Sequence, residues 1–141
     1  MDTMTPTRQA VQHLRRISLP AEPQAAAEAR TQVKAAIFAW GVPVDSSVAA
    51  LLTSELVTNA IMHVSGQTVL LDLTCTCGQL RVDVHDTSWA MPLQAQGHEP
   101  ADAESGRGLM LIDRLSDEWG FYRTMAGKAV YFALAIPAAR P

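Results

Sequence analysis

Residues 51–63 carry the clearest helical pattern in the chain, LLTSELVTNAIMH. At about 3.6 residues per turn, several apolar side chains gather on one side of this helix, which we expect to face a core. These side chains are Val48, Leu51, Leu52, Leu56 and Met62. Ser47, Ser54 and Thr58 fall on the opposite side, which we expect to face solvent. Cap candidates at residues 45–47 precede the helix.

Glu55, Asn59 and His63 are four residues apart and share the side that we expect to face the core. A carboxylate there costs free energy unless it is paired, hydrogen-bonded or open to a cavity. In one reading, a partner such as a buried arginine neutralises Glu55 and Asn59 caps a loop. In the other, a ligand and its metal neutralise Glu55. The helix alone leaves both readings open.

Changes in the spacing of apolar residues, together with Pro and Gly residues, mark the ends of the other helices and strands. Pro20 closes a first strand, and Pro23 opens a helix. The expected strands are residues 11–19, 68–76, 80–85, 118–124 and 129–136, and the further helices are residues 24–40 and 109–115. This order predicts an α+β fold, a two-layer sandwich of a mixed, mostly antiparallel sheet with helices on one face.

Two stretches have no usable period. Residues 1–10 are polar, so we expect a flexible N-terminal tail followed by a single domain over residues 11–141. Residues 87–105 mix Trp, Met, Pro, Gln and Gly. Because a loop of this length in a compact domain is usually functional, we expect it to form a lid.

Composition narrows the class of protein. The chain has 141 residues, 48% of them hydrophobic, which is enough for one core. The formal charge of −3 and the scattered Lys and Arg residues argue against a nucleic-acid or anionic-membrane partner. The sequence has no long apolar run and no signal-peptide pattern, so we expect a soluble cytoplasmic protein. Cys75 and Cys77 lack a second pair at metal-site spacing and are expected to be packing or surface thiols.

Gly106-Arg107-Gly108 lies where the long loop meets the short helix at Leu109. Glycines there let backbone N–H groups turn toward an anion, and a helix N-terminus supplies positive potential. This arrangement is typical of a phosphate site, although a simple tight turn uses the same residues.

Asp86 ends the strand Leu80 to His85, just where the long loop begins. A carboxylate at this position can accept a hydrogen bond from the exocyclic amino group of adenine. The structural alternative for Asp86 is a turn or cap residue.

In this order, the motifs resemble those of the GHKL (Bergerat-fold) ATPases over residues 51–132. The matching segments are Glu55 to Ala60 with His63 as the N box, Asp86 as the start of the adenine box, Gly106 to Ile112 as the phosphate box and Gly127 to Val130 as the final hairpin motif. Within that superfamily, the short chain is most similar to anti-sigma-factor serine kinases, especially small actinobacterial ATP-binding regulators. The resemblance implies the histidine-kinase-like ATPase fold.

The resemblance also implies ATP and Mg²⁺ as ligands. Asn59 would supply an oxygen to Mg²⁺, and Glu55 would accept the proton of an attacking hydroxyl. The implied nucleotide contacts are Asp86 on the adenine amino group, Ser88 and Ala129 near the base, and Gly106, Arg107, Gly108 and Leu109 in the phosphate box. For His63 we expect a packing role.

Two positions depart from the family pattern. Ser88 stands where the family usually has Gly, and Ala129 stands where its hairpin motif usually has Thr. The loss of one hydrogen bond costs about 1 kcal/mol, or roughly fivefold in affinity. We therefore expect a weakened site rather than an abolished one.

The resemblance implies an ATP-dependent serine/threonine protein kinase that regulates transcription by partner switching. Such a protein sequesters a sigma factor in one state and phosphorylates an antagonist protein in the other. The alternative is a regulatory module that holds a protein partner without catalysis. A detached histidine-kinase catalytic domain is disfavoured because the chain has no phosphoacceptor helix pair. A homodimer is expected, for which the edge of the strand at residues 11–19 is available.

Overall fold

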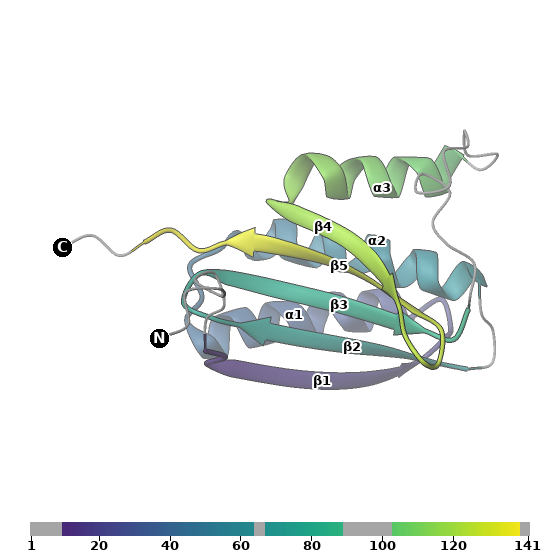
Figure 1. The fold of residues 1–141 in the computed structure, drawn as a ribbon, viewed down its shortest axis with the longest axis horizontal. Coiled ribbons are helices and arrows are strands. Elements are labelled where there is room, and N and C mark those ends of the chain that lie inside the picture. Colours follow the sequence, from purple (N-terminus) through teal and green to yellow (C-terminus); the bar gives the residue numbers. More distant parts are fainter. Residues whose placement is uncertain (1–9, 64–66, 89–102, 139–141) are drawn as a thin grey trace.

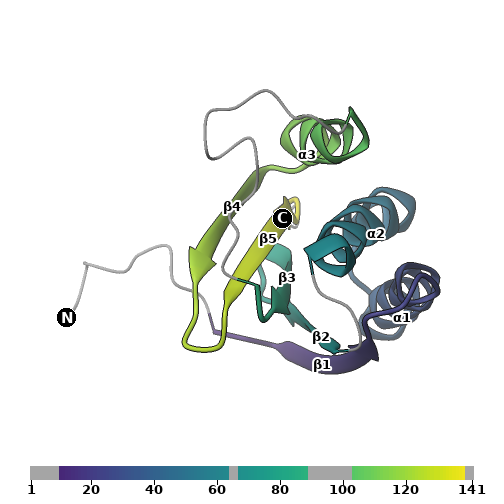
Figure 2. The same ribbon diagram turned by 90° about the vertical axis from the view of Figure 1, so that its right-hand side faces the viewer.

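A computed structural model of the chain shows a five-stranded sheet with helices on one of its faces (Figure 1, Figure 2). It describes residues 10–63, 67–88 and 103–138, with only the backbone described for His63 and residues 103–108. In chain order the elements are β1 (His13–Pro20), α1 (Ala25–Trp40), α2 (Ser46–His63), β2 (Thr68–Cys75), β3 (Gln79–Asp86), α3 (Ala103–Leu115), β4 (Glu118–Arg123) and β5 (Lys128–Ala135). The predicted α+β two-layer architecture is confirmed.

The strand order is β1-β2-β3-β5-β4, and every pairing in it is antiparallel. The expected mixed sheet is therefore fully antiparallel over the described strands. The pairing of β3 is the one that shapes the candidate site, because its neighbour is β5 rather than β4. That order brings the end of the chain against the strand that carries Asp86.

The face of the sheet toward the helices is apolar because apolar residues alternate along the strands. On β2, the side chains of Val69, Leu71 and Leu73 are fully buried. They pack with Leu52 of α2 and Phe132 of β5 in one hydrophobic cluster. In the sequence, Val69, Leu71 and Leu73 alternate with Leu70, Asp72 and Thr74, which predicts one buried face for this strand, and the structure confirms it. Cys75 belongs to this cluster and Cys77 is exposed, and both thiols are free.

Helix α2 lies between α1 and α3 and packs on β3 (Figure 2). Asp45 begins it, because the Oδ1 atom of Asp45 accepts the N–H groups of Ser47 and Val48 at 2.9 and 3.1 Å. The end of this helix that leads into β2 lies at the same end of the domain as the start of α3 (Figure 1).

The buried side of α2 differs from the expected one. Leu51 and Met62 are 38% and 49% exposed, whereas Thr53 and Ser54 are buried. Because α1 and α3 pack on both sides of α2, a wide part of its surface is buried. The prediction assumed a single apolar stripe and therefore misplaced the centre of the buried side. The buried hydroxyls of Thr53 and Ser54 donate to the carbonyls of Ala49 and Leu51, both at 2.8 Å.

Helix α3 begins at Ala103, six residues before the predicted start at Leu109. Gly106-Arg107-Gly108 is therefore helical rather than part of the preceding loop. Residues 1–9 of the expected tail and residues 89–102 of the expected lid lie outside the described residues. Within the described ranges, no helix is long and apolar enough to cross a membrane.

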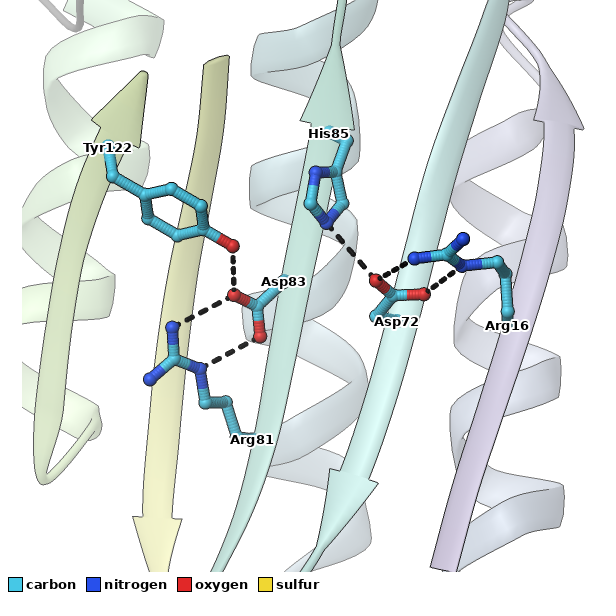
Figure 3. A network of polar contacts seen from close by, with 6 residues as sticks. All are labelled: Arg16, Asp72, Arg81, Asp83, His85 and Tyr122. Atoms are coloured by element: carbon cyan, nitrogen blue, oxygen red, sulfur yellow. Dashed lines mark hydrogen bonds and ion pairs between the residues drawn. The ribbon is translucent and has the colours of Figure 1, made fainter. Parts of the chain in front are cut away.

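The face of the sheet away from the helices carries two carboxylates, each in its own polar cluster (Figure 3). Asp72 accepts from the Nε and Nη2 atoms of Arg16 at 2.7 and 2.9 Å. Asp83 accepts from the Nε and Nη2 atoms of Arg81 at 2.9 and 3.0 Å. The hydroxyl of Tyr122 donates to Asp83 at 2.7 Å. These contacts tie β1 to β2 and β3 to β4.

Candidate functional site

Glu55 and Asn59 lie one turn apart on α2, and both are half-buried. Leu56 and Ala60, which follow them in the chain, point into the core. The two polar side chains therefore border the buried side of α2. Neither makes a hydrogen bond or an ion pair with another described side chain, so no arginine among the described residues neutralises Glu55.

Asp86 ends β3 and faces the helices, because Leu80, Val82 and Val84 of the same strand alternate onto that face. Directly opposite in the register stands Lys128, the first residue of β5. The Nζ atom of Lys128 donates to both carboxylate oxygens of Asp86, at 3.0 and 2.8 Å. The two side chains are only 3% and 2% exposed.

A third donor also binds this carboxylate. The backbone N–H of Ser88 donates to the Oδ1 atom of Asp86 at 2.8 Å. This contact is the Asx-type turn that the structural alternative for Asp86 describes. Both oxygens that were expected to read adenine are therefore engaged within the protein.

The sequence reasoning did not single out Lys128. It is a charged residue on the face of β5 that is otherwise apolar and carries the buried Val130 and Phe132. Because a buried charge needs a partner, a lysine at this position in an apolar strand could have indicated an ion pair. The partner depends on β3 pairing with β5 in this register, which no local pattern encodes.

Gly127 allows the hairpin loop to close against the end of β3. A Cβ atom built on Gly127 would lie 2.6 Å from the Thr87 Cα atom and closer still to the Asp86 carbonyl oxygen. Only glycine fits at this approach. The loop is held by the Gly127 N–H, which donates to the Thr124 hydroxyl at 2.9 Å.

Ala129 lies on the face of the sheet away from Asp86. Its register partner is His85, and successive side chains of a strand point to opposite faces. The structure therefore gives no support to the expected contact of residue 129 with a base held by Asp86. In the hairpin motif, the side chain that binds the Asp86 carboxylate is that of the neighbouring residue, Lys128.

The phosphate-box residues lie on α3, which packs beside α2. Leu109 is buried in the hydrophobic core, which gives it a packing role. Only the first turn of a helix has free N–H groups, so Arg107 and Gly108, in a helix that begins at Ala103, lie beyond them. The N–H groups of residues 106, 107 and 108 could all bind phosphate only if the first turn of α3 unwound. The side chains of His63 and Arg107 lie outside the described ones.

Four segments lie at the same end of the domain (Figure 1). They are the end of α2, the end of β3, the start of α3 and the hairpin loop between β4 and β5. The elements that carry Asn59, Asp86 and the phosphate box thus all reach this end of the domain. An open hollow of about 380 Å³ lies elsewhere, between the end of β1 and α1, and is lined by residues such as Pro20 and Glu28.

The fit of this region to ATP and Mg²⁺ is mixed. An amide oxygen and a carboxylate without described partners are the groups that a magnesium phosphate complex needs. The carboxylate that was expected to read the base, in contrast, is already paired with the ammonium of Lys128.

Comparison with known proteins agrees with the fold. The family described as "Histidine kinase-like ATPase domain" matches residues 19–134, which include all the candidate residues. The crystal structure of the RsbU and RsbW domains of Rv1364c from Mycobacterium tuberculosis superposes with a TM-score of 0.64 and 20% sequence identity. The match covers 92% of this chain and 34% of that chain, so this chain spans about a third of that protein's solved length. A search of curated proteins gave no match. On the family match, supported by the shared fold, the chain belongs to the histidine kinase-like ATPase domain family.

Proposed function

We propose that this protein binds ATP with Mg²⁺ and transfers the terminal phosphoryl group to a serine or threonine hydroxyl of a partner protein. The observation that carries the proposal is the position of Glu55 and Asn59 at the edge of the buried side of α2. Neither has a hydrogen-bond or ion-pair partner among the described side chains. Polar side chains that lie at the edge of a buried face and make no described structural contact are candidates for a functional site.

Each residue has a distinct role in this proposal. The side-chain oxygen of Asn59 holds Mg²⁺, and the start of α3 with Gly106 lies beside the phosphates. Bound Mg²⁺ neutralises the charge of the phosphates. Asp86 is the residue nearest the base.

Glu55 acts as the general base. One of its carboxylate oxygens accepts the proton of the substrate hydroxyl while the hydroxyl oxygen attacks the terminal phosphorus. The bond from that phosphorus to the bridging oxygen breaks, and ADP leaves with the bond's electron pair. Glu55 then releases its proton to water.

The proposed biological role is partner switching in the cytoplasm. The protein would sequester a sigma factor, phosphorylate a small antagonist protein and so regulate transcription, as a homodimer. The support is the structural likeness to a chain that contains RsbU and RsbW domains. Because the identity is 20%, that likeness supports the fold, and the partners are part of the proposal.

The second candidate is a regulatory module that holds a protein partner without phosphotransfer. The observation that favours it is the ion pair between Asp86 and Lys128, which engages the residue proposed to lie nearest the base. Equal affinity of the wild type and Asn59→Ala for the partner, with no phosphotransfer in either, would support this candidate.

Isothermal titration with ATP and ADP, with and without Mg²⁺, tests the first step. We expect binding that Mg²⁺ strengthens, and no binding at millimolar nucleotide would overturn the proposal. A panel of antagonist proteins with radiolabelled ATP then tests transfer. Glu55→Ala should retain ATP affinity and lose transfer, whereas Thr58→Ala, an exposed change on the same helix, should retain both.

A further inference from the structure

The buried pair between Asp86 and Lys128 bears on which nucleotides the proposed site accepts. This inference rests on the proposed ATP site, because Asp86 is the residue nearest the base in it. The ammonium group of Lys128 donates to both oxygens of Asp86, and both side chains are almost completely buried. The pair joins the end of β3 to the start of β5, at the end of the domain that also holds the end of α2 and the start of α3 (Figure 1).

The acceptor capacity of this carboxylate is largely used. Its Oδ1 atom accepts from Lys128 and from the Ser88 N–H, and its Oδ2 atom accepts from Lys128. An ammonium donor forms a stronger hydrogen bond to a carboxylate than a neutral amino group does. The amino group of adenine is neutral, so it is the weaker competitor for Asp86.

The surrounding structure holds Lys128 in place. Its backbone is fixed opposite Asp86 by the β3 and β5 register. Gly127 packs directly against the backbone of Asp86 and Thr87, so the hairpin loop lies against the end of β3. Removing the ammonium from the pair would leave Asp86 as an unpaired buried charge, which is strongly disfavoured.

We propose that Lys128 is a specificity-determining residue that competes internally for the base-reading carboxylate. With Asp86 engaged, the amino group at C6 of a purine adds little to binding. Phosphate and Mg²⁺ contacts then supply most of the affinity, and the site accepts purine nucleoside triphosphates with little regard to the C6 substituent. The ATP affinity of the wild type is correspondingly low.

A comparison of ATP with ITP tests this directly, because ITP carries a keto oxygen where ATP has the amino group. Isothermal titration in Mg²⁺ should give wild-type affinities for the two that agree within about threefold. In Lys128→Met, which removes the ammonium but keeps an unbranched apolar stem, the affinity for ATP should rise by about tenfold. The ratio of ATP to ITP affinity should rise by a similar factor.

The matched control is Arg16→Met, which breaks the ion pair with Asp72 on the other face of the sheet. Both nucleotide affinities of this variant should equal those of the wild type. Lys128→Thr provides a second test should the Met variant not fold, and the wild-type comparison needs no variant.

Two outcomes would overturn the inference alone: a wild type that already prefers ATP to ITP by more than about tenfold, or a folded Lys128 variant with unchanged affinities and ratio. Absence of binding of either nucleotide to the wild type and to the folded variants would overturn the ATP site itself, and this inference with it.

Discussion

Asp72 on β2 and Asp83 on β3 stand directly opposite each other in the sheet, and each carboxylate is bound by a different arginine. Like charges at directly opposite positions destabilise a sheet. Arg16 from β1 and Arg81 from β3 turn this conflict into two separate ion pairs (Figure 3). The stability contributed by this face of the sheet therefore depends on its ion pairs and hydrogen bonds. We expect that stability to change with pH in both the acid and the alkaline range.

We predict that the Arg16 and Asp72 pair stabilises the fold above the acid range. The hydrogen bonds from Arg16 hold the pKa of Asp72 below its ordinary value of 3.8. The stabilisation is thus present above about pH 4 and is lost as the pH falls through the lower folded-state pKa. Urea unfolding at a series of pH values should give free energies for the wild type and Arg16→Met that converge at low pH. Curves that stay parallel would contradict the prediction.

The second prediction concerns the alkaline range. Burial, followed by the hydrogen bond to Asp83, raises the pKa of Tyr122 from 10.0 to about 12. A raised pKa means that the related stability is present below about pH 10 and is lost as the pH rises toward 12. Tyrosinate absorbance in a Tyr131→Phe variant, which leaves Tyr122 as the only tyrosine, measures this pKa.

Asp83→Asn in the same background separates the two causes of the Tyr122 shift. The variant should lower the pKa of Tyr122 but leave it above 10.0, because burial is the larger cause. A return to the ordinary value would show that the carboxylate, rather than burial, dominates.

We predict that Gly127→Ala destabilises the fold by about 3 kcal/mol, because the added Cβ would overlap the backbone at the end of β3. Gly41→Ala is the matched control. Gly41 ends α1 with φ of 66°, and nothing lies within 4 Å of an added Cβ. Its cost should be only conformational, about 1–2 kcal/mol. Chemical denaturation measures both, and equal costs would refute the close approach of Gly127.

The fourth prediction separates a functional from a structural role for Asn59. Because its side chain has no described partner, Asn59→Ala should change the free energy of unfolding by less than about 0.5 kcal/mol. The affinity for ATP in Mg²⁺ should fall by about tenfold, and the affinity without Mg²⁺ should change little. Leu56→Ala, at a buried position three residues earlier, should instead cost about 2–5 kcal/mol of stability. Titration and urea unfolding of the two variants measure both quantities.

The sequence alone determined the local features of this fold. Alternation in β2 predicted its buried face, and Asp45 was among the expected caps of α2. The order of strands and helices predicted two layers, and the motifs placed Glu55 and Asn59 on a helix with Asp86 at a strand end. Each of these features depends on residues a few positions apart, so the period and the turn residues suffice to reveal it.

Tertiary structure alone decided the environment of each site residue. The placement of α2 between α1 and α3 turned its buried side toward Thr53 and Ser54. The pairing of β3 with β5 brought Lys128 onto Asp86, two residues 42 positions apart in the chain. The physical reason is that strand partners and register are set by the packing of the whole domain, whereas sequence periodicity reports only which side of an element is apolar.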